Sequence, residues 1–117
     1  MPSMNGNINQ KLKIVTPTTV KAKGWVDFEP GDPATVEVWV GVAQGVKKQP
    51  GAVYGDGWVE VANPNPAAVV TQTVNWETDA TIDNGAGIFH PGAADGAAVA
   101  IGNGKPYPWG RQVNLMP

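Results

Sequence analysis

Pairs of carboxylates are the side chains of this 117-residue chain that come nearest to a catalytic arrangement. Asp27 and Glu29 share one face of an expected strand, close to Asp32 in the turn that follows. Glu37 and Glu60 lie at polar positions of two other expected strands. Two carboxylates suffice for glycoside hydrolysis, and carboxylate oxygens also bind Ca²⁺. A solvated strand face explains these spacings better, because a chain this short has little room for a deep cleft.

The chain lacks the residues that nucleophilic and metal-dependent catalysis usually require. It has no Cys, and Ser3 and His90 are the only residues of their types. Ser3 lies in an N-terminal segment that is expected to be extended, whereas a catalytic Ser needs a rigid position beside its base. A histidine metal site usually has two or three His or Cys ligands. We therefore expect no enzyme, no cofactor and no metal site.

One acidic stretch leaves a calcium site open as an alternative. Residues 79–85 contain two aspartates and end in Asn-Gly, so they match only the last part of a calcium-binding loop.

Tryptophan is the most informative residue type in the chain. Trp25, Trp39 and Trp58 share a strand face with charged or polar residues and alternate with the apolar positions. If the valine faces point inward, these three rings lie on the outside of the fold. Exposed rings on strands stack on sugars or anchor protein contacts, since they bring a large apolar area with few rotatable bonds. The structural alternative is that each ring covers a lysine stem or pairs with a ring across the strands.

A second aromatic site is predicted in residues 104–110. Tyr107 and Trp109 each follow a proline there, and proline fixes φ, so a rigid loop is expected to present both rings. The alternative is that Trp109 caps one end of the core. The predicted binding residues are therefore Trp25, Trp39, Trp58, Tyr107 and Trp109.

The elements that must position these rings are β-strands. The chain has 16 Val and 5 Ile but only 2 Leu, and β-branched residues suit the pleated surface of a strand. Apolar and polar residues alternate in several segments: 11–15, 20–28, 35–42, 58–61 and 69–77. Weaker strands are expected at 81–82, 98–101 and 112–115.

Seven or eight short strands at regular spacing predict an all-β fold. The expected architecture is a two-sheet antiparallel sandwich, immunoglobulin-like or jelly-roll-like. It forms a single domain over residues 1–117, with 1–10 as an extended N-terminal segment. The side chains predicted to point into its core are Val26, Phe28, Val36, Val38, Val40, Val59 and Val61.

Charge is unevenly distributed along the chain. The net charge of −2 provides no overall basic field, so nucleic acid is not an expected partner. Residues 1–25 carry four lysines and no acid, and the remainder carries a net charge of −6. The lysines either protect a solvated strand edge or let one copy meet another head to tail. Membrane insertion is not expected, because no run of 18 apolar residues and no signal peptide is present.

Two functions fit these features. The first is a non-catalytic structural or assembly protein, such as a virion or capsid-decorating component. It would bind protein through self-association or within a larger assembly. The alternative is a glycan-binding β-sandwich module that uses the exposed Trp and Tyr residues. No compartment is predicted beyond the virion that the first function implies.

Overall fold

The structure is a computed structural model that describes residues 4–45, 52–82 and 87–117. In these residues the chain forms eight β-strands joined by turns and short connections. The strands are β1 (Gly6–Ile8), β2 (Lys11–Thr16), β3 (Thr19–Phe28), β4 (Thr35–Gly45), β5 (Ala52–Ala62), β6 (Gln72–Thr81), β7 (Gly92–Gly102) and β8 (Lys105–Met116).

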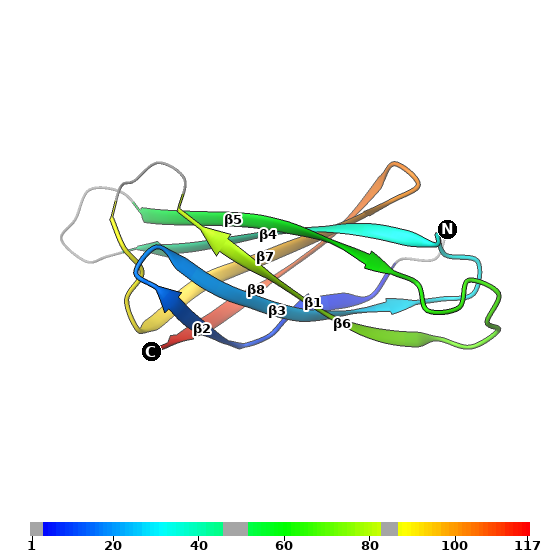
Figure 1. The fold of residues 1–117 in the computed structure, drawn as a ribbon, viewed down its shortest axis with the longest axis horizontal. Helices are drawn as coiled ribbons and strands as arrows, with labels where there is room; N and C mark the ends of the chain where they lie inside the picture. Colours follow the sequence, from blue (N-terminus) through cyan, green and yellow to red (C-terminus); the bar gives the residue numbers. More distant parts are fainter. Residues whose placement is uncertain (1–3, 46–51, 83–86) are drawn as a thin grey trace.

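Seven of the described strands close into a mixed β-barrel (Figure 1). Their order around the barrel is β3-β2-β8-β7-β4-β5-β6, and β6 pairs back to β3. Strands β2 and β8 are parallel, and the other neighbours are antiparallel. Strand β1 pairs with the second half of β3, while β2 pairs with its first half.

The predicted antiparallel sandwich, whether immunoglobulin-like or jelly-roll-like, is therefore wrong. A sandwich consists of two sheets with open edges, whereas β3 has partners on both sides and β2 bridges to β8. Alternation shows which side chains point inward, and it is the same in a sandwich and in a barrel. It contains no information about which strands pair, so it did not distinguish the two folds.

Several strands are longer than predicted. The expected strands 98–101 and 112–115 belong to β7 and β8, which have 11 and 12 residues. A two-residue turn joins these two strands, with Asn103 and Gly104 both at positive φ. The expected strand 69–77 instead begins at Gln72 and continues to Thr81 as β6.

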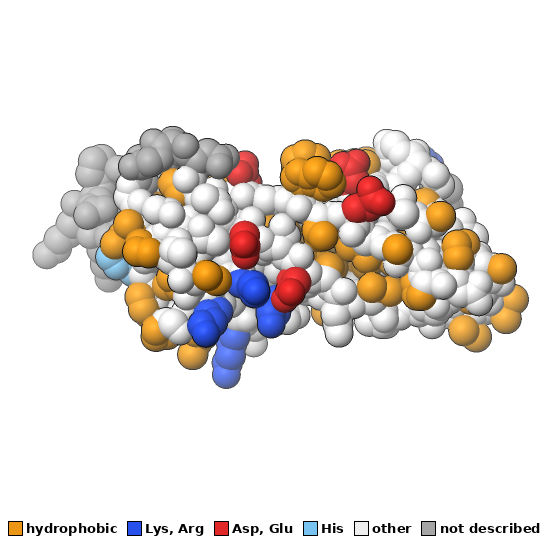
Figure 2. All heavy atoms as spheres, viewed as in Figure 1, with side chains coloured by type: hydrophobic (Ala, Val, Ile, Leu, Met, Phe, Trp, Pro, Cys, Tyr) orange, Lys and Arg blue, Asp and Glu red, His pale blue; other side chains and the backbone are white. Residues whose placement is uncertain are grey.

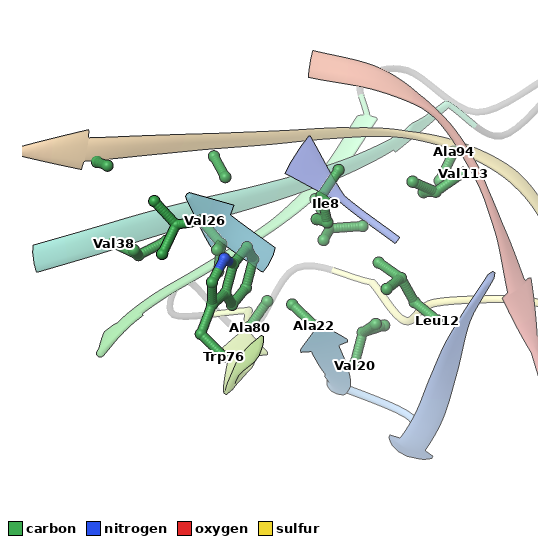
Figure 3. Packing of buried hydrophobic residues seen from close by; sticks show 14 of the residues in the cluster. Ile8, Leu12, Val20, Ala22, Val26, Val38, Trp76, Ala80, Ala94 and Val113 are labelled. Carbon is green, nitrogen blue, oxygen red and sulfur yellow. The ribbon is translucent and has the colours of Figure 1, made fainter. Parts of the chain in front are cut away.

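The core fills the inside of the barrel (Figure 3). The predicted inward positions are confirmed, because six of the seven side chains are buried and Val59 packs against the core half-buried. Further buried residues, which were not among the predicted inward positions, complete the core: Ile8, Leu12, Val20, Trp76, Val113 and Leu115.

Replacing Val38 with Ala should lower the free energy of unfolding by about 1–3 kcal/mol. Val38 is fully buried on β4, a strand with barrel neighbours on both sides. Removing its two methyl groups loses apolar burial and leaves a small cavity. Urea denaturation followed by fluorescence measures the change, and an unchanged midpoint would show that Val38 does not face the core.

Candidate binding site on the outer surface

The outward residues of β5, β4, β7 and β8 form a regular grid, because the strands are paired without a register shift. One row across the four strands is apolar and consists of Trp58, Trp39, Val99 and Pro108. The next row along consists of Asp56, Gly41, Ala97 and Gly110. The third row consists of Tyr54, Ala43, Asp95 and Gln112. The small residues of the middle row leave a depression that crosses the strands.

This depression is an open groove of about 370 Å³, which we call the trench. Its floor is formed by Gly41, Ala43 and Ala97 on β4 and β7. Trp39 and Tyr54 line it from the rows on either side. The trench is therefore a shallow, mainly apolar site with aromatic walls on the outer surface of the barrel.

Trp39 and Trp58 form the most prominent aromatic feature of this surface. Their ring centroids are 5.6 Å apart and their planes differ by 21°, so the two rings stack across the strands. They nevertheless remain 43% and 52% exposed, which confirms the predicted exposure of both. Figure 2 shows apolar side chains protruding along the upper edge of the molecule with acidic side chains nearby.

Tyr54 belongs to the same surface and was not among the predicted binding residues. It is 53% exposed, and its ring lies over Gly41, where an added Cβ would come within 2.5 Å of the Tyr54 hydroxyl oxygen. Tyr54 lies before the expected strand, which began at Trp58, whereas β5 begins at Ala52. Tyr54 and Trp58 are four residues apart on the same strand. Because side chains alternate between the two faces of a strand, both rings lie on one face.

Four carboxylates surround the aromatic rings. Asp56 and Asp95 line the trench, and Glu37 and Glu60 lie directly opposite each other beside the tryptophan pair. Strands β4, β5 and β7 contain no Lys or Arg. We call the outward surface of these three strands, with its four carboxylates, the acidic face.

The third predicted tryptophan lies elsewhere on the barrel. Trp25 is half-buried on β3, between Asn7 of β1 and Asn75 of β6. Strand β3 is separated from β4 by β5 and β6 in one direction and by three strands in the other. Trp25 therefore does not join Trp39 and Trp58 in one surface.

Tyr107 and Trp109 lie in strand β8, so the prediction of a rigid loop at 104–110 is wrong. Both rings are half-buried and pack against the core. The indole Nε1 of Trp109 donates a hydrogen bond to the carbonyl oxygen of Met4, at 3.3 Å. The ring thus packs against the core beneath the N-terminal segment, and Trp109 also lines the trench.

Asp27, Glu29 and Asp32, in and beside the turn after β3, are engaged in local hydrogen bonds. Thr73 donates its hydroxyl proton to Asp27, and Thr71 donates to Glu29 at 2.7 Å. Asp32 accepts a hydrogen bond from the backbone N–H of Glu29 at 2.6 Å. These contacts tie the end of β3 to the start of β6 and to the turn, which gives the three carboxylates a structural role.

His90 lies exposed in the segment before β7, and Ser3 lies outside the described residues. The buried side chain of Gln44 holds the backbone of His90, accepting from its N–H and donating to its carbonyl oxygen, both at 2.8 Å.

Within the described ranges, no group of three or more His, Cys, Asp or Glu residues is arranged to hold a metal ion. The calcium alternative at 79–85 falls partly on 83–86, which lie outside these ranges. No helix long and apolar enough to span a bilayer occurs in the part of the chain that is described.

Comparisons with known proteins give no family for this chain. No protein-family model and no curated protein matches it. Among solved structures, a β-glucosidase from Listeria innocua in complex with glucose matches 98% of the chain at 11% identity, with a TM-score of 0.48. An alkylpurine DNA glycosylase from Pseudomonas fluorescens bound to DNA matches 96% at 13% identity, with a TM-score of 0.43.

The chain spans only 16% and 30% of the lengths of these two enzymes. Nothing in these similarities supports a role in a virion or a capsid, which was part of the function expected from the sequence.

Proposed function

We propose that the protein is a non-catalytic carbohydrate-binding domain that holds a neutral glycan in the trench. The observation that carries this proposal is the exposed, stacked pair of Trp39 and Trp58 beside a groove with a floor of small residues. Aromatic rings offer a flat apolar surface to the C–H faces of a sugar ring. The shallow floor lets that ring approach the strands closely.

The stacking of the two tryptophans prepares this surface for binding. Trp58 packs against Trp39 and limits the rotation of a side chain that would otherwise be free on an exposed strand. A ring already fixed in place loses less conformational entropy when a ligand stacks on it. The pair therefore acts as a unit in which Trp39 lines the trench and Trp58 supports it.

The carboxylates indicate the charge of the ligand. Asp56 and Asp95 line the trench and are hydrogen-bond acceptors, which suits the hydroxyl groups of a sugar. With Glu37 and Glu60 nearby and no basic residue on β4, β5 or β7, the field over this face is negative. A glycan bearing sulfate or carboxylate groups would be repelled, so a neutral one fits best.

The trench also has the shape for a chain of sugars. It crosses the strands from β5 to β8, three strand spacings, or about 14 Å. Its outer surface position leaves it open along this direction, so a linear glycan can extend beyond it at either end. A site that binds internal sugars of a long glycan must be open at both ends, whereas a site for a single terminal sugar is usually enclosed.

Replacing Gly41 with Ala tests the proposal. The new Cβ would fill the trench floor and displace the hydroxyl end of Tyr54, and we expect at least about a tenfold rise in Kd, or ~1.4 kcal/mol. Because Tyr54 is exposed and can swing outward, folding should be little affected.

The matched control is Gly45→Ala on the same strand, where an added Cβ meets no atom within 4 Å. A glycan array identifies the ligand, and calorimetry then gives Kd for each variant. If no neutral glycan on the array binds the wild-type protein, or if Gly41→Ala binds as tightly as Gly45→Ala, the trench is not a glycan site.

A further inference from the structure

Two surfaces of the barrel place like charges directly side by side. On the acidic face, Glu37 of β4 lies opposite Glu60 of β5. On the other surface, Lys13 of β2 lies opposite Lys21 of β3. Like charges directly across a strand pair destabilise a sheet. Each pair therefore favours the approach of an opposite charge from outside the chain.

The lysine-bearing surface is formed by the outward side chains of β2 and β3, and we call it the lysine face. It consists of Lys11, Lys13, Lys21 and Lys23. Figure 2 shows these basic side chains gathered on the lower side of the molecule, over β2 and β3.

Two of the four lysines on the lysine face have a carboxylate opposite them in the same chain, and the other two do not. Lys23 forms an ion pair with Glu77 of β6 at 3.8 Å, and Lys21 lies opposite Asp79 of the same strand. Lys11 and Lys13 lie on β2, and across from them β8 offers only the uncharged Asn114 and Met116. The exposed positive charge is therefore concentrated on β2.

The acidic face has the corresponding excess of negative charge. Among the described residues, neither Glu37 nor Glu60 has an ion-pair partner. Strands β2 and β3 lie across the barrel from β4, and the acidic face is separated from them by β6 on one side and by β8 on the other. One copy of the chain therefore cannot bring its own two faces together, but two copies can.

We propose that the lysine face of one copy docks on the acidic face of a second copy. The contact joins different surfaces of the two copies, so each copy keeps one free face, and further copies add until the assembly forms an open filament or closes into a ring. A standard interface takes about 800 Å² from each partner, about an eighth of the 6610 Å² surface of the protein. Opposite sides of the barrel have room for one such contact each.

This association does not depend on what the trench binds. A docked copy covers the acidic face, so self-association and ligand binding would compete for it. A neutral glycan can be titrated at 1 M salt, where the charged contact is weak. Failure of one proposal therefore leaves the other intact.

Light scattering of the wild-type chain at two salt concentrations is the first test. In 10 mM salt the screening length is about 30 Å, and in 1 M salt it is about 3 Å. We expect a weight-average mass at least about twice that of the monomer at low salt, where the monomer is 12.2 kDa, and the monomer mass at high salt. A monomer at both concentrations, or an oligomer that survives 1 M salt, would overturn the proposal.

Two charge-reversed variants make the test specific. Lys11→Glu with Lys13→Glu removes the basic docking surface, and Glu37→Lys with Glu60→Lys removes the acidic one. Each variant alone should be monomeric at low salt, because reversing two of the four charges cancels the net charge of one face and leaves the other face without a complementary surface. An equimolar mixture should associate again, since each variant offers the face that the other needs. All four positions are at the surface, so circular dichroism should show the wild-type fold; a mixture of folded variants that stays monomeric would refute the docking.

Discussion

The Gly57→Ala variant should lose about 3 kcal/mol of stability, the upper end of the range for overpacking. Gly57 lies at an inward-facing position of β5, and a Cβ there would overlap the backbone carbonyl oxygen of Asp79 on β6. A carbonyl within a strand cannot turn away as a flexible side chain can. Either β6 moves outward or β5 bends, and both changes separate the two strands.

Strands β5 and β6 share fewer paired residues than any other neighbours in the described ring, so further separation there would open the barrel. One register pair, Asp56 with Thr81, joins the two strands. The hydroxyl of Thr78 adds a hydrogen bond to the carbonyl oxygen of Trp58, at 3.1 Å. With one paired position, a displaced strand has few backbone hydrogen bonds to restore it.

Gly110→Ala is the control, because an added Cβ at this strand glycine meets its nearest atom at 3.6 Å, an ordinary contact. Its stability should stay within about 0.5 kcal/mol of the wild type, as for most surface substitutions. Guanidinium denaturation compares the two variants. Equal stability of both would show that β5 and β6 do not approach closely at Gly57 and that the barrel is open there.

The inward faces of the strands could be predicted from the sequence, whereas the strand pairing could not. Val36, Val38 and Val40 alternate with polar residues, and this pattern is local, so it fixes which side of the strand is buried. The parallel contact of β2 with β8 joins Lys11 to Asn114. No local pattern records a partner so distant in the sequence, and this contact is the one that excludes the sandwich.

Two local features would have improved the prediction of the fold. Asn103-Gly104 is the dipeptide most typical of a two-residue hairpin turn, and it joins β7 to β8 in the structure. This turn signal predicts one long hairpin in place of the two short strands at 98–101 and 112–115 and the loop at 104–110. Gly55 and Gly57 occupy inward-facing positions of β5 where an apolar side chain would be expected. A glycine in a strand interior often indicates a close approach of another backbone.

The candidate site could be predicted only in part, for a related reason. The alternation of apolar and polar residues predicts that Trp39 and Trp58 point outward, and both are exposed. The same alternation predicts that Trp25 points outward, but it does not show where a strand lies around the barrel. Strand β3, which carries Trp25, is far from β4 in the ring. Which rings share a surface depends on strand order, and strand order was the missing information.

Replacing Trp39 with Ala should weaken glycan binding by about 2 kcal/mol, or ~30-fold in Kd, the size of a binding hot spot. Trp39 lines the trench and stacks on Trp58, so its removal takes away the aromatic wall and leaves Trp58 without its partner. Trp58→Ala should have a smaller effect, because Trp58 acts by supporting Trp39. Trp25→Ala, on the opposite part of the barrel, should bind as the wild type does.

Iodide quenching of tryptophan fluorescence distinguishes glycan binding from protein contact at this surface. The exposed Trp39 and Trp58 should be quenched in the free monomer at high salt. Soluble oligosaccharide should then protect them, and the protection should disappear in the Trp39→Ala variant. Protection that appears only when the chain self-associates at low salt, with no effect of sugar at high salt, would assign the aromatic surface to protein contact. In that case the tryptophan pair is an interface anchor, and the neutral glycan is not its ligand.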